Sequence, residues 1–290
     1  MPRLLCALAL LLALPAAGQE LTGTLKKIKD SGSVSIGYRE SSIPFSYLNA
    51  AKRPIGYSID LCLEIVEEVK DALGVEDLDV KYVPVTPETR IDMVASGKVD
   101  LECGSTTNNL ERQKRVAFSP VIFVSGTKLM VRRPVKIRSY LDLKDKTVAV
   151  TAGTTNQQAM KVLSDKRKLG IRFTVAKDHA HSFALVAKGE ADAFATDDVL
   201  LYGLIATSGR AKEFQVIGDF LSYDPYGIMY RRGDQEFDDV VKSAFERLAT
   251  SRELEQTYNK WFLRKLPTGE RLNLPMSAQL RSIFEVLGLP

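Results

Sequence analysis

The densest set of ligand-type side chains lies between residues 102 and 118, in the sequence ECGSTTNNLERQKRVAF. Hydroxyl groups, including that of Ser105, lead into a predicted helix whose N-cap lies in the Thr-Asn-Asn of residues 107–109. Arg112 follows within about two turns of the helix start, where unpaired N–H groups and the macrodipole are already positive. Hydroxyls such as that of Thr107, a helix N-terminus and a guanidinium form a receptor for a carboxylate or phosphate. The alternative is a solvated charge run behind an ordinary cap.

A second group of polar side chains follows predicted strands in the other half of the chain. A hydroxyl-rich turn that includes Thr155 opens a helix, and Asp197 and Asp198 follow a short apolar strand. Ligands of open α/β sheets bind beyond the carboxyl ends of the strands, so we expect both groups to face one cleft. Such a cleft suits a zwitterion, with its carboxylate on Arg112 and its ammonium on Asp197 or Asp198. This charge pattern is typical of a receptor for amino acids.

Two arginines and a histidine follow or precede other predicted elements near the same edge. Arg39 comes directly after the first strand, Arg90 begins a helix, and His179 follows a later strand. If both arginines face the cleft, they suit a second carboxylate on the side chain of the ligand. The alternatives are a helix-surface arginine at position 90 and a polar loop histidine at position 179.

The order of the predicted elements indicates two similar lobes. Strands and helices alternate, which favours an α/β fold with a mostly parallel sheet and helices on both faces in each lobe. Five positions of residues 91–100, including Gly97 and Asp100, recur in residues 183–192 at a constant offset, so the element is repeated. Two extended connections imply a two-strand hinge. The predicted divisions are residues 19–122 and 222–290 for lobe 1, residues 123–221 for lobe 2, and a hinge near residues 120–126 and 217–224.

The N-terminus has the pattern of a cleaved secretory signal over residues 1–18. One arginine precedes an apolar run from Leu4 to Leu14, and Pro-Ala-Ala-Gly follows it. The run is too short for a membrane span, which needs about 20 residues. Removal of the signal leaves 272 of the 290 residues, enough for two domains. We therefore expect export to the periplasm as a free protein.

Composition excludes several classes of function. The formal net charge of +4 over 290 residues is no signature of nucleic-acid binding. The chain has no metal-spaced Cys/His cluster, nucleophile elbow or phosphate P-loop, so we expect no metal and no cofactor. Two of the three cysteines, Cys62 and Cys103, lie beyond the signal. In an oxidising compartment they can form one disulfide, and the alternative is two buried thiols.

A set of segments resembles the family-three (polar amino acid) solute-binding proteins of ABC importers. In order along the chain these segments are YRESSIPFSY, GYSIDL, RIDMVASGKVDLECGSTTNNLERQKRVAFS, TAGTT, AKDHAHSF and ADAFATDD. The resemblance covers essentially the whole chain after the signal. It implies a two-lobed periplasmic-binding-protein fold, a ligand such as L-glutamate or L-aspartate, a membrane permease as partner, and a monomer.

The resemblance also implies roles for single residues. Arg112, with the hydroxyls and backbone of Ser105, Thr107 and Thr155, would hold the α-carboxylate, and Asp197 the ammonium. In the branch of the family that binds acidic amino acids, groups matching Arg39, Arg90 and His179 surround the side-chain carboxylate. One residue departs from that branch, since Pro87 replaces a serine and so removes one side-chain hydrogen bond.

Other functions fit the same fold. A binding protein for another polar amino acid, such as glutamine, would keep the zwitterion receptor. An enzyme of the cyclohexadienyl dehydratase type would need an acid/base pair, for which Glu40, Asp178 and His179 are the candidates. A receptor module would need a transmembrane helix or a further domain. Because the fold serves all of these functions, the site has to decide between them.

Overall fold

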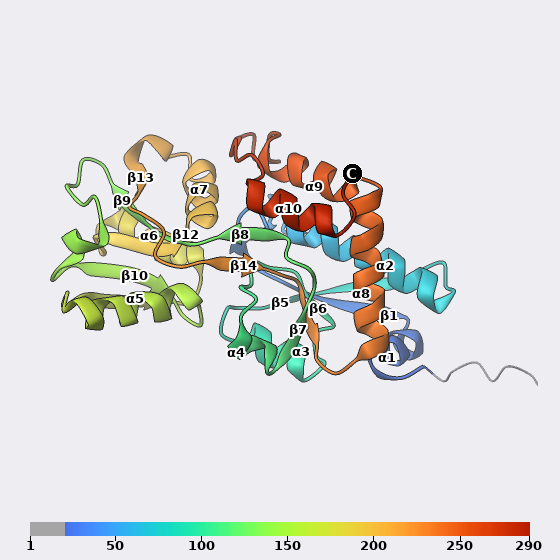
Figure 1. The fold of residues 1–290 in the computed structure, drawn as a ribbon. Helices are drawn as coiled ribbons and strands as arrows, with labels where there is room; N and C mark the ends of the chain where they lie inside the picture. The colour runs from blue at the N-terminus through green and yellow to red at the C-terminus, as the bar shows by residue number, and fades with distance from the viewer. Residues whose placement is uncertain (1–20) are drawn as a thin grey trace, which may run out of the picture.

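The computed structural model describes residues 21–290, so the predicted signal peptide lies outside the described residues. Figure 1 shows two lobes side by side, with two strands running between them. Each lobe is built around one five-stranded sheet. The predicted two-lobed α/β fold is therefore confirmed.

The sheet of lobe 1 has four strands in one direction and one in the other. In spatial order its strands are β5 (Asp79–Pro84), β1 (Ser33–Tyr38), β6 (Leu101–Glu102), β15 (Met229–Arg231) and β7 (Val116–Phe118). β1 pairs in parallel with β5 and β6, whereas β15 pairs antiparallel with β6 and β7. A small sheet follows β1 and consists of β2 (Ser41–Ser42), β3 (Ser46–Leu48) and β4 (Pro54–Ile55).

The helices of lobe 1 cover both faces of its sheet. They are α1 (Gly23–Ser31), α2 (Tyr57–Leu73), α3 (Arg90–Ala95), α4 (Leu110–Gln113), α8 (Gln235–Thr250), α9 (Glu253–Phe262) and α10 (Ala278–Val286). Ile65 of α2 belongs to the large core on one face, and Val94 of α3 belongs to a separate cluster with Val99 and Met229 on the other. Figure 1 shows α9 and α10 above β8, which with β14 links the lobes.

The sheet of lobe 2 has the same arrangement of directions. In spatial order its strands are β11 (Arg172–Ala176), β10 (Thr147–Thr151), β12 (Ala193–Asp197), β9 (Thr127–Arg132) and β13 (Phe214–Ile217). Here β9 runs against the other four. The covering elements are α5 (Thr155–Arg167), α6 (His179–Lys188), α7 (Asp198–Thr207) and the short 3-10 helices η1 (Tyr140–Leu143) and η2 (Ala211–Glu213).

Side-chain alternation along β10 explains why helices lie on both faces of this sheet. Val148 and Val150 pack with Met160 of α5 in one cluster. Ala149, between them, packs in the other cluster with Val186 of α6. Successive side chains of a strand point to opposite faces, so one apolar strand serves two helical layers.

The repeated sequence element makes the same contact in both lobes. The Asp100 carboxylate accepts the backbone N–H of Ser35 at 2.9 Å, and the Asp192 carboxylate accepts that of Thr147 at 2.8 Å. The backbone N–H of each aspartate returns a bond to the carbonyl of the same partner, at 2.9 and 2.8 Å. Each aspartate thus fixes the start of the strand that follows it, β6 or β12, against the neighbouring parallel strand, β1 or β10.

Two antiparallel strands join the lobes. They are β8 (Phe123–Ser125) and β14 (Asp224–Tyr226), with Asp224 opposite Ser125 and Tyr226 opposite Phe123. The aromatic rings of these strands, Phe123 and Tyr226, pack into the core of lobe 1. There Phe123 stacks on Phe262, with ring centroids 4.9 Å apart. The link is therefore anchored at one end by aromatic packing, and its polar residues lie between the lobes.

A disulfide joins Cys62 of α2 to Cys103, directly after β6, with Cα atoms 6.2 Å apart. Both cysteines are fully buried. The bridge ties the helix to the strand that leads into the Ser-Thr-Thr turn of the predicted site. Of the two alternatives open at the level of sequence, the structure contains the bridged one.

Loss of this disulfide should destabilise the protein. The bridge spans a sequence separation of 41 residues, and loop-closure entropy predicts a loss of about 4 kcal/mol for a loop of that size. We expect Cys62→Ala/Cys103→Ala to lose this amount in urea unfolding, and reduction of the wild-type protein to reproduce it. A loss below about 1 kcal/mol in both experiments would contradict the prediction.

Candidate functional site

The two lobes contact each other around the mouth of the cleft. The backbone N–H of Ala180 in α6 donates to Ser41 Oγ in β2, with an N···O distance of 3.3 Å. A Cβ at Gly203 of α7 would lie 2.4 Å from the carbonyl oxygen of Ile43. A Cβ at Gly153 would lie 2.8 Å from a backbone nitrogen of lobe 1. Because larger residues at these two glycines would push the lobes apart, the structure is a closed conformation.

A small cavity lies between the closed lobes and gathers most of the predicted ligand-binding residues. Its volume is about 10 Å³, so the side chains that line it nearly fill the space between the lobes. The residues that line it are Arg90, Ser105, Thr107, Thr154, Thr155, Asn156, His179, Asp197 and Leu200. Arg39 and Arg112 are not in this lining, but both are buried and interact electrostatically with Arg90. The predicted residues thus converge from both lobes.

Arg39 and Arg90 lie buried beside Glu102, which the sequence analysis did not select. Arg90 Nη1 donates to Thr106 Oγ1 at 2.6 Å, and Thr106 Oγ1 donates to Glu102 Oε2 at 2.7 Å. Glu102 and Arg39 also approach each other across Gly104. A Cβ placed on this glycine would lie 2.3 Å from Glu102 Oε1 and 2.9 Å from Arg39 Cγ. Glu102 is therefore the nearest counter-charge of this arginine pair.

Each arginine of this pair has an unpaired hydrogen-bond donor. Arg39 Nη1 and Arg90 Nε are buried and have no hydrogen-bond partner. Burial, together with the neighbouring guanidinium of Arg90, lowers the pKa of Arg39 to about 9, and burial lowers the pKa of Arg90. Both groups still carry their protons at neutral pH, but in an environment that disfavours the charge. An incoming carboxylate would relieve this cost and take the free donors.

Arg112 is a buried residue of α4, which is a short helix. Asn109 caps α4, accepting the backbone N–H of Arg112 at 2.9 Å, but α4 is a single turn that leads into β7. Arg112 Nη1 donates to the carbonyl of Thr107 at 2.8 Å, and burial lowers the pKa of Arg112 to about 9, with Arg90 as the next cause. The next two cations, Lys114 and Arg115, are exposed and paired with acidic side chains. They form an ordinary solvated surface.

His179 is the first residue of α6 and is a buried neutral ring. Asp178 caps this helix by accepting the backbone N–H of His181 at 2.8 Å. His179 Nδ1 lies 3.0 Å from Thr151 Oγ1. Burial and the charges of Arg39 and Arg90 hold the pKa of His179 well below its usual range. An anion bound beside the arginines would raise that pKa again.

Asp197 is the acidic group on the lobe 2 side of the cavity. Its Oδ1 accepts Asn156 Nδ2 at 2.7 Å and its Oδ2 accepts the hydroxyl of Tyr226. Burial and the nearby carboxylate of Asp224 raise the pKa of Asp197 to about 8. Asp198 is engaged elsewhere, accepting Ser125 Oγ at 2.7 Å, and does not line the cavity. Of the two aspartates named for the ammonium, the geometry favours Asp197.

A carboxylate of the linking strand joins the two lobes at the cavity. Asp224 Oδ1 accepts the hydroxyl of Thr107, from lobe 1, at 3.0 Å and that of Thr155, from lobe 2, at 2.9 Å. The two threonine oxygens are 3.3 Å apart. Asp224 is thus the meeting point of both lobes and the hinge strand.

Several residues of this site escaped the sequence analysis. They are Thr154 and Leu200 of the cavity lining, together with Glu102, Asn156, Asp224 and Tyr226. Signals for Glu102 and Asn156 were present, because Glu102 begins the segment of residues 102–118 and Asn156 follows Thr155. Nothing local marks Asp224, because its threonine partners are 117 and 69 residues away in the sequence.

The acid/base pair that an enzyme would require is not assembled. Glu40 is exposed, and the Asp178 carboxylate is occupied by the N–H and ring of His181. His179 bonds to a hydroxyl rather than to a carboxylate. Within residues 21–290 there is also no cluster of three or more metal-ligating side chains.

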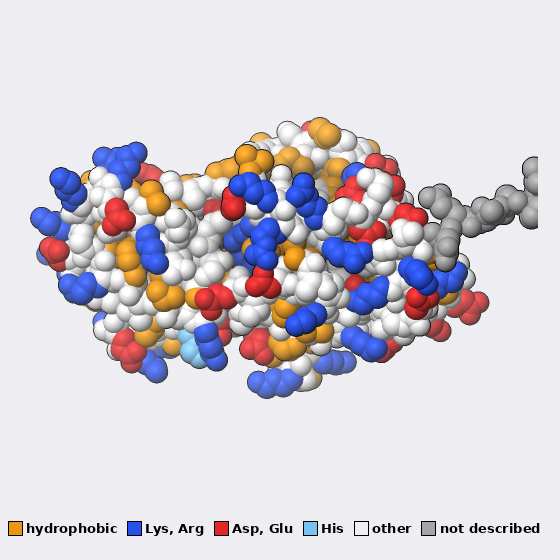
Figure 2. Space-filling view, turned by 90° about the horizontal axis from the view of Figure 1, so that it is seen from below, with side chains coloured by type: hydrophobic (Ala, Val, Ile, Leu, Met, Phe, Trp, Pro, Cys, Tyr) orange, Lys and Arg blue, Asp and Glu red, His pale blue; other side chains and the backbone are white. Residues whose placement is uncertain are grey.

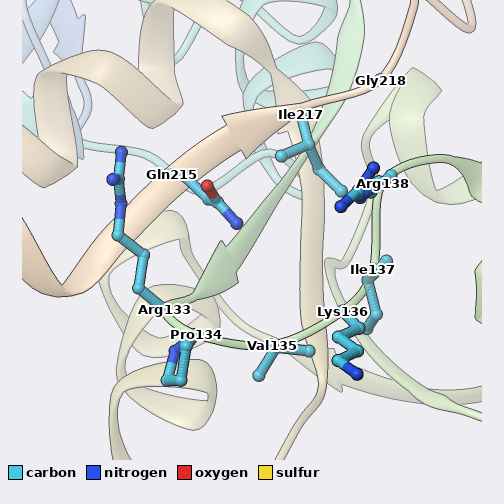
Figure 3. Close-up of a pocket in the computed structure, with 9 residues that line it drawn as sticks. All are labelled: Arg133, Pro134, Val135, Lys136, Ile137, Arg138, Gln215, Ile217 and Gly218. Carbon is cyan, nitrogen blue, oxygen red and sulfur yellow. The ribbon is translucent and has the colours of Figure 1, made fainter.

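A wider hollow on lobe 2 lacks the features of this site. It lies between β13 and residues 133–138 and has a volume of about 520 Å³. Figure 3 shows that the side chains of Arg133, Lys136 and Arg138 point in different directions rather than toward one centre. It offers no converging set of groups for a small ligand.

The outer surface is mixed in charge. Figure 2 shows Lys and Arg side chains interspersed with Asp and Glu over the face it presents, without one continuous basic field. No helix between residues 21 and 290 has the length and apolarity that crossing a membrane requires.

Two lobes closed over a buried, charged cavity define a two-lobed ligand-binding protein. The chain belongs to the bacterial extracellular solute-binding proteins, family 3, whose model matches residues 34–264. The members of this family that it resembles are named as binding proteins, and the chain is accordingly a solute-binding protein and not an enzyme.

Two curated relatives and one solved structure illustrate the match. The chain is 46% identical over 278 residues to the L-glutamate/L-aspartate-binding protein of Pseudomonas aeruginosa, covering 95% of this chain and 92% of the relative. It is 40% identical over 274 residues to the glutamate/aspartate import solute-binding protein of Escherichia coli, covering 94% and 89%. A crystal structure of a mutant arginine-binding protein, ArgBP of T. maritima, superposes with a TM-score of 0.73 at 26% identity, covering 82% and 98%.

Proposed function

We propose that this protein captures an acidic L-amino acid, L-glutamate or L-aspartate, between its lobes and delivers it to the permease of an ABC importer. The observation that carries the proposal is the distribution of charge around the cavity. Arg39 and Arg90 offer free buried donors at one side, Arg112 is a second cationic group, and Asp197 is a buried carboxylate. Two anionic groups and one cationic group on the ligand would complement this pattern.

Each predicted ligand-binding residue has a matching role in this proposal. Arg112, Ser105 and the helix start at Thr155 receive the α-carboxylate, and Asp197 receives the ammonium. Arg39, Arg90 and His179 surround the side-chain carboxylate. Thr107, between these groups, contributes its hydroxyl. Ser105 Oγ is buried without a partner, which supports its use by a ligand.

The relatives support the ligand and the setting. Those of Pseudomonas aeruginosa and Escherichia coli are named for glutamate and aspartate, and the latter for import. We infer from this and from the signal-like N-terminus that the protein works as a monomer in the periplasm. Its lobes would divide at residues 122–123 and 221–222, with β8 and β14 as the hinge. Pro87 is buried close to Arg90 in sequence and offers no hydroxyl to the ligand.

Calorimetric titration of the ligand-free protein with glutamate, aspartate, glutamine and arginine tests the proposal. We expect glutamate and aspartate to bind, and glutamine to bind at least about tenfold more weakly because it leaves buried guanidinium donors without a charged partner. Arg39→Met should lower the affinity for glutamate by about 100-fold and that for glutamine by only a few-fold. The exposed Arg53→Met is the control and should change neither. Equal affinities of the wild-type protein for glutamine and glutamate would refute the acidic specificity.

A further inference from the structure

The Asp224 carboxylate accepts hydrogen bonds from three neighbouring hydroxyl groups. Thr107 and Thr155 donate to its Oδ1, and Ser222 Oγ donates to its Oδ2. An ionised carboxylate only accepts, and each hydroxyl has one proton, so the direction of these three bonds is fixed. Both threonine oxygens therefore present lone pairs, not protons, to the cavity that they line.

A chain of hydrogen bonds connects Asp197 with Asp224, and its donors point outward from Asn156 to both carboxylates. Asn156 Nδ2 donates to Asp197 Oδ1 and to Thr127 Oγ1, each at 2.7 Å. Thr127 Oγ1 lies 2.7 Å from Ser222 Oγ, whose proton is already given to Asp224. Thr127 must then donate to Ser222, and the chain is satisfied in one orientation only. The two carboxylates are thus held in one fixed polar network.

Within residues 21–290, the two carboxylates have no cationic side chain in direct contact, although the charge of Arg112 acts on both of them. Both are buried, and neither forms an ion pair with a lysine, arginine or histidine among the residues that the structure describes. The charge of Asp224 also raises the pKa of Asp197, which shows that the two groups act on one another. Buried carboxylates without a cation are costly, so the place between them is suited to a positive group from outside.

We propose that Asp224 is a positioning residue of an ammonium subsite, where it turns the hydroxyls of Thr107 and Thr155 into acceptors and adds a second negative charge to that of Asp197. This rests on the proposed function, because it assigns the α-ammonium of the bound amino acid to this place. It changes the role of the two threonines, whose hydroxyls accept from the ammonium. The α-carboxylate then takes the Arg112 guanidinium and the backbone N–H groups at the start of α5.

The test compares L-glutamate with glutarate, which has the same two carboxylates and no ammonium. In Asp224→Asn the charge is lost, and the amide brings protons that compete for the threonine oxygens. We expect the affinity for glutamate to fall about 10- to 100-fold and that for glutarate to stay within about threefold. Asp234→Asn is the control, because Asp234 is also a buried carboxylate, accepting the backbone N–H of Thr24 at 2.6 Å, outside the cavity. It should change neither affinity.

A second variant separates positioning from a simple loss of charge. Thr155→Val keeps the shape of the side chain and removes its hydroxyl. If Asp224 acts partly through that hydroxyl, Asp224→Asn should weaken glutamate binding less in the Thr155→Val background than in the wild type. Full additivity of the two substitutions would overturn the positioning role.

The remaining outcomes also decide the proposal. An equal fall in the affinities for glutamate and glutarate would mean that Asp224 only maintains the fold. A gain in glutamate affinity would mean that Asp224 competes with the ligand for the hydroxyls. The wild-type titration tests the proposed function separately. If the wild type binds a different α-amino acid, the same ratio, measured with that amino acid and its analogue without the amino group, still decides the role of Asp224.

Discussion

Arg112→Ala should abolish ligand binding while leaving the protein folded. Arg112 is the buried cation nearest to the helix turn, with only 8% of its surface exposed, and one of its nitrogens is used by the Thr107 carbonyl. Loss of one partner of a buried charge pair costs about 3 to 5 kcal/mol, which corresponds to a fall in affinity of roughly 100- to 1,000-fold or more for every amino acid tested. The measurement is calorimetric titration with glutamate, aspartate and glutamine.

The stability of the ligand-free protein should respond differently. Burial lowers the pKa of Arg112, so its charge is disfavoured in the folded state at every pH at which it is protonated. Removing it takes away that cost along with one hydrogen bond, and we expect thermal unfolding of the free variant to change little. Arg115→Ala, at an exposed arginine paired with Asp92, is the matched control and should bind normally. A variant that loses stability and binding together would assign Arg112 to the fold instead.

The sequence was most informative where chemistry and local order coincide. Cations placed early in a helix are unfavourable unless an anion comes to them, and this reasoning marked the stretch that holds Arg112, Lys114 and Arg115 as a candidate anion site. The repeat of Gly97 and Asp100 predicted two lobes, because two copies of one element must be positioned by two similar sheets. Both predictions depend on residues that are close in the chain.

Sequence reasoning failed where the partners are distant or where burial decides. Position alone could not distinguish a surface arginine at position 90 from a buried one. The helix that Arg90 begins has only six residues, too few for their pattern to show which face is buried. Asp224 lies in an extended segment that no local pattern links to the site, and it meets its threonines only when both lobes and the strands between them are assembled. The local sequence also does not show that α4 is only one turn long. The strand that follows it, β7, is defined by its pairing with β15, more than 110 residues later in the chain.

Glutamate binding should depend on pH through Asp197. In the ligand-free protein burial and Asp224 raise the pKa of Asp197 to about 8, so the carboxyl is largely protonated at pH 6. A ligand ammonium favours the ionised form, and binding below pH 8 must therefore release a proton. We expect this group to strengthen the binding as pH rises from 6 to 8, by up to tenfold per pH unit, and to add no further gain above that range.

The same shift predicts the pH dependence of stability. Between pH 4 and 8 the native state holds a proton on Asp197 that the unfolded chain has lost, so this group makes the free protein less stable as pH rises through that range. The thermal stabilisation produced by saturating glutamate should accordingly be larger at pH 8 than at pH 6. Other groups that face Asp197 are Asp224, Asp198 and Tyr226, and His179 and Arg90 line the same cavity, so the dependence has to be read as a difference between variants.

Asp197→Asn supplies that difference. The amide is nearly isosteric, cannot titrate and offers no charge to an ammonium, so we expect about 100-fold weaker binding of glutamate at pH 8. The loss should shrink at pH 6, where the wild-type carboxyl is itself neutral, and the free variant should be more stable than the wild type at pH 8. Titrations in two buffers of different ionisation enthalpy count the protons released. If wild type and variant released the same number, the proton would come from another group, and Asp197 would not be the anion that receives the ammonium.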